Sequence, residues 1–210
     1  MCGRYALYGP RKRSRAEHQY FEGLFDFPPS YNVAPTRVMP IACVVDGAVG
    51  LTPARWGLKG IAKKISAHGE KINIWGDYRV PYRAGRRCLV SACGFFEWEN
   101  RPDGKQPYYF LSPEGELLAF AGLWEQWEQA DGQVLTTCTI VTTEPNDFVR
   151  RFHDRMPVVL DEKDYDHWLT ADDPQALLKA CHNKALTNYP VSRRVNNVRN
   201  DDPSLIEPLQ

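Results

Sequence analysis

The middle of the chain alternates apolar segments with turn signals, a pattern typical of antiparallel β-structure. Residues 87–98 are apolar and aromatic enough to form a buried strand that ends near Glu97. Asp103-Gly104 predicts a hairpin turn into a strand at 107–111. Turn signals at 113–115 and 131–132 delimit further strands, which we expect at 117–124, 134–142 and 155–160. Turns at this spacing favour a sheet that closes into a barrel or sandwich.

Helical patterns are fewer. Residues 14–25 could form one helix, and 161–169 begins with the acidic residues that a helix N-terminus favours. Pro174 in a first turn, with Asp173 as N-cap, predicts a third helix over 175–182. The chain shows no internal repeat and no interdomain linker. We therefore expect an α+β fold: a single domain over 1–210, dominated by an antiparallel β-sheet or barrel with a few flanking helices.

Composition narrows the class of protein. The 210 residues are 43% hydrophobic and 25% charged, which is ordinary for a soluble globular chain. No apolar segment approaches the thickness of a bilayer, and the first residues lack a signal sequence, so we expect a cytoplasmic protein. The 26 basic and 26 acidic residues cancel, which argues against a general, histone-like nucleic-acid binder. Any DNA binding must rest on a local basic patch.

Six cysteines occur, and none forms a Cys-x-x-Cys pair or lies near histidines at zinc spacing. The sequence thus predicts no metal site and no cofactor. Cys2 differs from the others because loss of Met1 would give it a free α-amine beside its thiol. The amine's ordinary pKa is about 7.7–8.0 and the thiol's about 8.5. Such a pair condenses with an aldehyde, first to an imine and then to a thiazolidine. Position alone still favours an incidental cysteine at a chain end.

Two further residues could move protons. His153 precedes a predicted strand, and histidine is the natural proton shuttle near neutral pH, although a structural, hydrogen-bonded histidine is more common. Glu97 lies among aromatic residues, and burial there would raise its pKa and make it a general acid. A glutamate at a strand end that faces water or pairs with an arginine is the alternative. Asn32 and Asn73 are ambiguous as isolated residues, because asparagine commonly occupies turns and helix caps.

Together these pieces resemble the SOS response-associated peptidase family, whose members include abasic site processing proteins. The resemblance follows almost the whole chain in order, and the N-terminal cysteine strengthens it. The matching stretches are Cys2-Gly3-Arg4-Tyr5, Tyr31-Asn32-Val33-Ala34-Pro35-Thr36, Arg55-Trp56-Gly57-Leu58, Gly94-Phe95-Phe96-Glu97-Trp98 and His153-Asp154-Arg155-Met156-Pro157.

The resemblance implies a β-rich fold with a basic groove for single-stranded DNA, and a role in the DNA damage response. It implies that mature Cys2 forms a thiazolidine with the ring-opened sugar of an abasic site. Glu97 would open the sugar ring and manage protons, His153 would act as acid and base, and Asn73 would orient the sugar. The positions that would hold DNA or shape its pocket are Arg4, Asn32, Trp56, Thr142 and Arg155. A monomer, associated with the nucleoid when bound to DNA, is the expected state.

The chain departs from the family at Asn73-Ile74-Trp75, where Trp75 replaces the family's usual arginine. Two other functions remain open. One is a cysteine peptidase that removes its own first residue, with Cys2, Glu97 and His153 as nucleophile, proton manager and base. The other is a non-covalent binder of damaged or modified DNA, in which Cys2 is incidental. If Met1 persists, Cys2 has no free amine and no thiazolidine can form.

Overall fold

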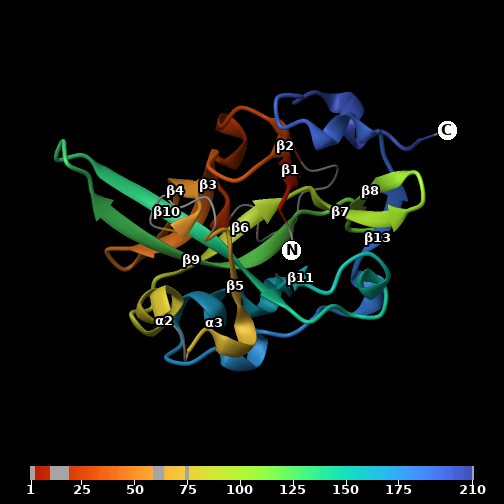
Figure 1. Cartoon of the computed structure of the whole chain (residues 1–210). Coiled ribbons are helices and arrows are strands. Elements are labelled where there is room, and N and C mark those ends of the chain that lie inside the picture. The colour runs from red at the N-terminus through yellow and green to blue at the C-terminus, as the bar shows by residue number, and fades with distance from the viewer. Residues whose placement is uncertain (1–2, 10–18, 59–63, 74–75, 210) are drawn as a thin grey trace.

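The computed structural model describes residues 3–9, 19–58, 64–73 and 76–209 (Figure 1). Within these ranges the chain is mainly β-structure. Thirteen strands form two sheets, and two short α-helices lie beside each other at one end of the larger sheet (Figure 1).

The larger sheet contains a closed ring of five strands. The ring runs β10–β4–β3–β6–β9 and returns to β10, because β9 and β10 also pair with each other. Its members are β3 (Val38–Val45), β4 (Ala48–Trp56), β6 (Arg87–Ala92), β9 (Leu118–Glu128) and β10 (Val134–Thr143). Every pairing in the ring is antiparallel except that of β10 with β4. Three short strands extend it: β5 (Ser66–His68), β11 (Met156–Pro157) and β12 (Val159–Leu160).

The second sheet has five antiparallel strands in the order β13–β8–β7–β1–β2. These are β13 (Thr187–Pro190), β8 (Gly104–Leu111), β7 (Gly94–Arg101), β1 (Tyr5–Leu7) and β2 (Ser30–Val33). The start of the chain therefore lies inside a sheet, between β7 and β2. The backbone N–H of Phe96 donates to the carbonyl of Arg4 at 3.0 Å, which extends this pairing beyond β1.

Helices cover one end of the barrel. They are α2 (Gly76–Arg83) and α3 (Tyr165–Thr170), and single 3-10 turns occur at Leu24–Asp26, Gly69–Lys71, Val149–Arg151, Glu162–Asp164, Gln175–Leu177, Asn183–Ala185, Arg193–Asn196 and Pro203–Ile206. Arg87 of β6 joins both helices to the barrel, because its guanidinium donates to the carbonyls of Trp168, Tyr82 and Ala171. None of the helices in the described ranges reaches the length and apolarity that crossing a bilayer requires.

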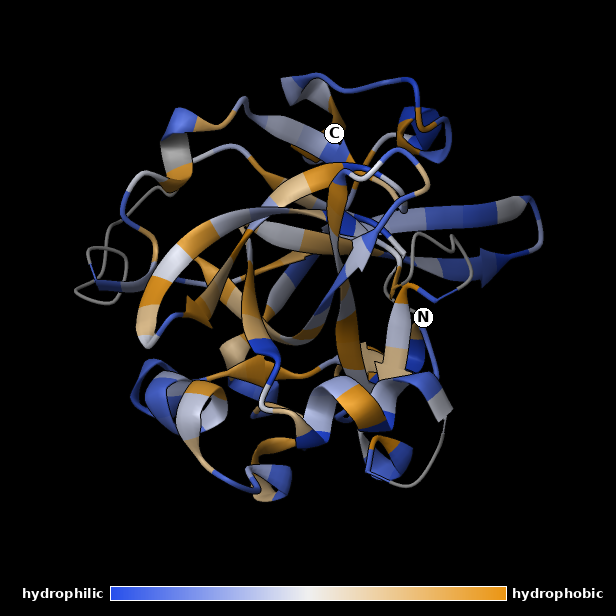
Figure 2. Cartoon of the chain, turned by 90° about the vertical axis from the view of Figure 1, so that its left-hand side faces the viewer, coloured by the Kyte–Doolittle hydropathy of each residue, from blue (hydrophilic) through white to orange (hydrophobic). Residues whose placement is uncertain are grey.

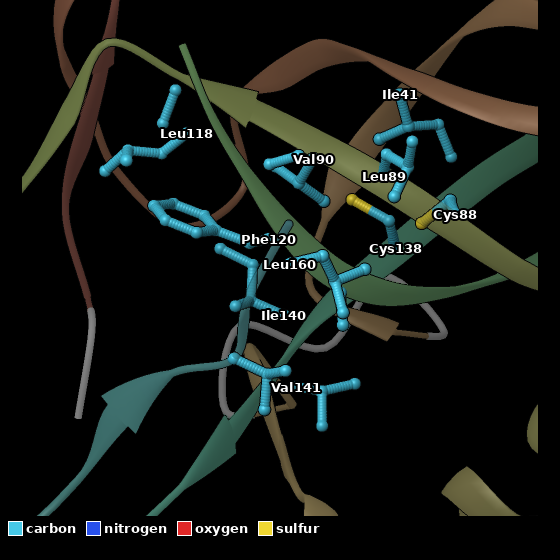
Figure 3. Packing of buried hydrophobic residues seen from close by; sticks show 14 of the residues in the cluster. Ile41, Cys88, Leu89, Val90, Leu118, Phe120, Cys138, Ile140, Val141 and Leu160 are labelled. Carbon is cyan, nitrogen blue, oxygen red and sulfur yellow. The ribbon is translucent and has the colours of Figure 1, made fainter. Parts of the chain in front are cut away.

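Hydrophobic residues are frequent along the barrel strands, and hydrophilic residues dominate the surrounding loops (Figure 2). Cys88 and Cys138 belong to the same buried cluster as Leu89, Val90 and Ile140 (Figure 3). All five side chains are at most 3% exposed. Burial of this much apolar surface is the main source of the barrel's stability.

The structure confirms the predicted fold class and corrects several elements. The single strand expected over 87–98 is two strands that break at Cys93, so that β6 stays in the barrel and β7 enters the second sheet. Gly94 makes this change of sheet possible. A Cβ at Gly94 would lie 2.4 Å from the carbonyl oxygen of Phe110 on β8. Only glycine therefore allows β7 and β8 to approach this closely.

Other boundaries also differ from the sequence predictions. The helix expected over 175–182 is wrong beyond Leu177, because Leu178 leaves the helical region at ψ 61°. The helix expected over 161–169 begins as a 3-10 turn, and 155–160 divides into β11 and β12. Much of 14–25 lies outside the described residues. The sequence predictions missed α2, the strands β1 to β5, and β13.

Candidate active site

A pocket of about 510 Å³ opens where β7 meets the loop that follows β10 and the C-terminal part of the chain. It is lined by Arg4, Glu97, Trp98, Asn100, Lys105, Phe152, His153 and Asn196. The pocket thus unites three residues that the sequence singled out from segments far apart in the chain: Arg4, Glu97 and His153.

Glu97 is a buried carboxyl group in this pocket. Its side chain follows Phe95 and Phe96 on β7, and the residue is 2% exposed. Burial raises the pKa of Glu97 to about 7, because the charged form loses its hydration. The carboxyl therefore exchanges a proton readily near neutral pH, which is what a general acid or base requires.

His153 is half-buried on the opposite wall. Its Nδ1 accepts a hydrogen bond from the backbone N–H of Arg155 at 2.9 Å. The Asp154 carboxylate is 2.8 Å from the same nitrogen, but its side chain is 88% exposed, and we assign Nδ1 as the acceptor of the backbone bond. The proton of the neutral ring then lies on Nε2. Burial lowers the pKa of His153, so the ring is neutral at physiological pH.

Arg4 is held by the protein on several sides. Its Nη1 donates to Asn32 Oδ1 at 2.8 Å and to the carbonyl of Val195 at 2.6 Å, and Nη2 donates to the carbonyl of Asn196 at 3.3 Å. The guanidinium also lies 6.0 Å from the ring centroid of Trp98. Burial lowers the pKa of Arg4, and neutral oxygens, not a carboxylate, satisfy these donors.

Asn32 connects the start of the chain to its last residues. It is 2% exposed, and its Nδ2 donates to the carbonyls of Val195, Asn197 and Asn200. The neighbouring carboxylate of Asp201 accepts from Ser30 Oγ and from two backbone N–H groups of β2. Because these contacts consume its polar groups, Asn32 supports the pocket wall from behind and does not face the opening.

Arg155 is likewise fixed in an ion pair. Its Nη1 and Nη2 donate to the two oxygens of Glu70 at 3.0 and 2.9 Å, and Nη2 also donates to the carbonyl of Thr142 at 2.7 Å. Thr142 is fully buried, and its hydroxyl donates to the carbonyl of Ala67. The guanidinium of Arg155, which the resemblance assigns to DNA binding or to the pocket, is therefore bound to the Glu70 carboxylate in this structure. The carbonyl of Thr142 holds the same guanidinium in place.

Comparison with known proteins identifies the family of this chain. Residues 1–198 match the family described as SOS response associated peptidase (SRAP). The chain belongs to the SRAP family. It is 35% identical over 99% of both chains to the abasic site processing protein YoqW of Bacillus subtilis. It is also 30% identical to the abasic site processing protein HMCES of Gallus gallus, over all of this chain and 78% of that protein.

Solved structures show the same SRAP-type fold. A protein from Bacteroides thetaiotaomicron aligns over 100% of both chains with a TM-score of 0.81 and 21% identity. A phage-related protein from Bordetella bronchiseptica aligns over 91% of this chain and 95% of its own, with a TM-score of 0.66 and 30% identity.

Trp56 and Asn73, like Asn32, Thr142 and Arg155, are marked by the SRAP resemblance but do not line the pocket. Trp56 is 2% exposed, its Nε1 donates to the carbonyl of Ile65, and its ring packs against Tyr5 at 5.2 Å. In this structure the core covers the Trp56 ring, so neither face of the ring is open to a base. Asn73 does not line the pocket, and its Oδ1 accepts from Arg83 Nε at 2.8 Å. Cys2 and Trp75 lie outside the described residues.

The sequence reading also missed pocket residues. Trp98, Asn100 and Lys105 come from the β7–β8 hairpin, in which Asn100 is paired with Lys105. A turn had been predicted at Asp103-Gly104, but β8 begins at Gly104 and not at residue 107. A strand that begins directly after this turn pairs Trp98 with Pro107, and Lys105 then lies two residues before Pro107 on the same strand.

Four of the five cysteines in the described residues have raised pKa values and are therefore poor nucleophiles. Cys43, Cys88, Cys93 and Cys138 are buried, and Cys181 is half-buried. Burial raises the pKa of Cys138 to about 12 and that of Cys181 to about 11, and it also raises the pKa values of Cys43 and Cys88. The reactive form of a cysteine is the thiolate, so these SRAP-family thiols are inert near neutral pH. No group of metal-ligating side chains occurs among the described residues.

Proposed function

We propose that this protein captures abasic sites in single-stranded DNA by a covalent thiazolidine bond to mature Cys2. The observation that carries the proposal is the pocket that brings Glu97 and His153 together against Arg4, two residues after Cys2. The names of YoqW and HMCES as abasic site processing proteins support the substrate class.

Chain geometry supports a nucleophile at Cys2. Two residues span at most about 7 Å of extended chain, so Cys2 cannot be far from the pocket wall that Arg4 forms. Arg4 itself is fixed by Asn32 and the C-terminal carbonyls. The reacting residue is thus tethered to a rigid point, which lowers the entropy cost of bringing its amine to a bound aldehyde.

The chemistry balances with the loss of one water molecule and no change of oxidation state. The α-amine of Cys2 attacks C1′ of the ring-opened sugar, and the resulting carbinolamine loses hydroxide together with a proton as water. The imine carbon then accepts the Cys2 sulfur, and the thiol proton moves to the imine nitrogen. A simple imine hydrolyses and invites β-elimination, so ring closure protects the strand.

Glu97 and His153 divide the proton transfers. With its pKa at about 7, Glu97 is partly protonated at neutral pH and can donate to the sugar ring oxygen on opening and to the departing hydroxyl. The neutral His153 ring can accept a proton from the attacking amine. Two groups with pKa values moved in opposite directions by burial form an acid and base pair at one pH.

Burial of Glu97 also favours a single strand as the substrate. A sugar must enter the pocket to reach a carboxyl group that is 2% exposed. Within a duplex this requires extrusion of the nucleotide, which costs a few kcal/mol and is least costly when the strand is already unpaired.

A denaturing gel tests the proposal. Purified protein, shown by mass spectrometry to lack Met1, is mixed with single-stranded DNA that carries one abasic site. We expect a heat-stable shifted band that is lost in Cys2→Ala and absent with intact DNA. Cys2→Ser distinguishes covalent capture from the peptidase alternative, because a thiazolidine needs sulfur whereas slow amide cleavage can use a hydroxyl. No shifted band from the mature wild-type protein would contradict covalent capture.

A further inference from the structure

The cationic side chains around the pocket differ in how much of their bonding capacity the protein already uses. Arg4 donates to Asn32 and two carbonyls, and Arg155 beside the pocket is in a bidentate pair with Glu70. Lys105 lines the same pocket and is exposed, and among the described residues its ammonium takes part in no hydrogen bond or ion pair. Lys105 is therefore the pocket cation whose charge remains available to a ligand.

The backbone of Lys105 is fixed even though its side chain is exposed. It follows the two-residue turn of the β7–β8 hairpin, where Arg101 is paired with Gly104 and Asn100 with Lys105. Arg193 of the C-terminal segment donates to the carboxylate of Asp103 in this turn at 2.6 Å. A lysine on a fixed strand presents a mobile point charge to a defined region of space.

The position of Lys105 relative to the reacting groups is also clear. Its charge lowers the pKa values of both Glu97 and His153, although burial has the larger effect on each. The ammonium thus lies within electrostatic reach of the two groups that handle protons, at the end of the pocket formed by the hairpin.

We propose that Lys105 binds a backbone phosphate of the nucleotide next to the abasic sugar. The inference rests on the proposed function, because a sugar bound at Glu97 must carry its two flanking phosphates toward the rim of the pocket. Phosphate contacts from lysine position the strand without reading its sequence, which suits a lesion that has lost its base. Asn100, opposite Lys105, can donate its amide to the same or the neighbouring phosphate.

Binding of a phosphate would also act on Glu97. The phosphate charge cancels the field of Lys105, which otherwise favours the ionised carboxylate. The bound DNA would then raise the fraction of Glu97 that carries a proton at the moment when the sugar ring must open.

The test measures binding to intact single-stranded DNA by fluorescence anisotropy over a range of salt concentrations. Intact DNA offers no aldehyde, so the result does not depend on covalent capture. We compare the wild type with Lys105→Ala, Lys105→Arg and the control Lys184→Ala, an exposed lysine that lines a different pocket. A lost phosphate contact reduces the slope of log affinity against log salt by about 0.7 for a single strand.

We expect this reduction and weaker binding in Lys105→Ala, with Lys105→Arg and Lys184→Ala close to wild type. A wild-type slope in Lys105→Ala, or an equal loss in Lys184→Ala, would overturn the inference. Absence of wild-type binding would overturn it as well. If covalent capture fails while the Lys105 effect is present, the proposed chemistry falls and the phosphate contact stands; the reverse result leaves capture intact and removes Lys105.

Discussion

The barrel interior and the pocket each contain a buried ionisable group, Cys138 in the barrel and Glu97 in the pocket. Burial makes the thiol less reactive near neutral pH and the carboxyl group more reactive. In the barrel, removal from water raises the pKa of Cys138 to about 12, away from neutrality. In the pocket, the same effect raises the pKa of Glu97 to about 7. A thiol becomes inert by this change, whereas a carboxyl group becomes exchangeable under physiological conditions.

This difference shows where reactivity can reside in the chain. Burial suppresses the thiolate of Cys43, Cys88, Cys138 and Cys181. The proposed nucleophile, Cys2, is the one cysteine that precedes the described residues. The barrel supplies rigidity, and the pocket supplies a buried carboxyl group, Glu97, whose pKa is about 7.

The largest effect is expected at Glu97. Removing a general acid typically lowers a rate by about 100-fold or more. Glu97→Gln should therefore reduce the rate of covalent capture by at least this factor, measured by quenched time points on a denaturing gel. Glu99→Gln is the matched control, because Glu99 is partly exposed on the same strand and pairs with Arg101. Equal rates in Glu97→Gln and wild type would remove Glu97 from the chemistry.

The pH dependence of stability gives a second test. Because the folded state raises the pKa of Glu97 from 4.5 to about 7, it favours the neutral carboxyl. The associated stability is fully present below pH 4.5 and is lost as the pH rises to about 7. The glutamine of Glu97→Gln does not titrate. As the pH rises across this window, the free energy of unfolding of the variant should therefore increase relative to that of wild type, by on the order of 2–3 kcal/mol.

Urea unfolding of both proteins at pH 4.5 and pH 8 measures this gain. A constant difference between Glu97→Gln and wild type at the two pH values would mean that Glu97 is not held in its neutral form by the fold.

Overpacking the barrel should affect stability without changing chemistry. A Cβ at Gly122 would lie 2.7 Å from Cys88 Sγ and 3.1 Å from the carbonyl oxygen of Thr139. Gly122→Ala should lower the free energy of unfolding by about 2 kcal/mol, because a packed core cannot make room for it. Gly50→Ala is the control, since a Cβ there meets no atom within 4 Å. Thermal unfolding measures both, and a neutral Gly122→Ala would show that the barrel is less tightly packed than described.

The smallest effect is expected at Cys138. Cys138→Ala removes one buried heavy atom and should cost about 1 kcal/mol of stability. Its rate of covalent capture per folded molecule should equal that of wild type, in contrast to Cys2→Ala. A loss of capture in a folded Cys138→Ala protein would show that a barrel thiol takes part in the reaction.

The sequence predicted the antiparallel fold because strand and turn signals are local. It failed where the outcome depends on distant neighbours. The change of sheet at Gly94 is set by the carbonyl of Phe110, and the end of the turn at Leu177 is set by backbone angles that the N-cap pattern does not report.

The site was predictable to a similar extent. Glu97 and His153 followed from residue type and the SRAP motifs, and the pocket does bring them together. The family resemblance predicted that Arg4 and Arg155 hold DNA or shape its pocket, but a linear sequence cannot show that Asn32 and Glu70 already bind them. The sequence predictions did not include Lys105. Its proposed role depends on the hairpin register and on the absence of a protein partner for its ammonium among the described residues, and a linear sequence shows neither.

The most direct test of the central claim is the location of the covalent bond. Trypsin digestion of the complex with abasic DNA, followed by mass spectrometry, should place the sugar on the peptide Cys2-Gly3-Arg4. Its mass should equal that of peptide plus sugar fragment less one water, without any reductant to trap it. An adduct on Lys105, on a peptide that retains Met1, or only after reduction would contradict thiazolidine formation at mature Cys2.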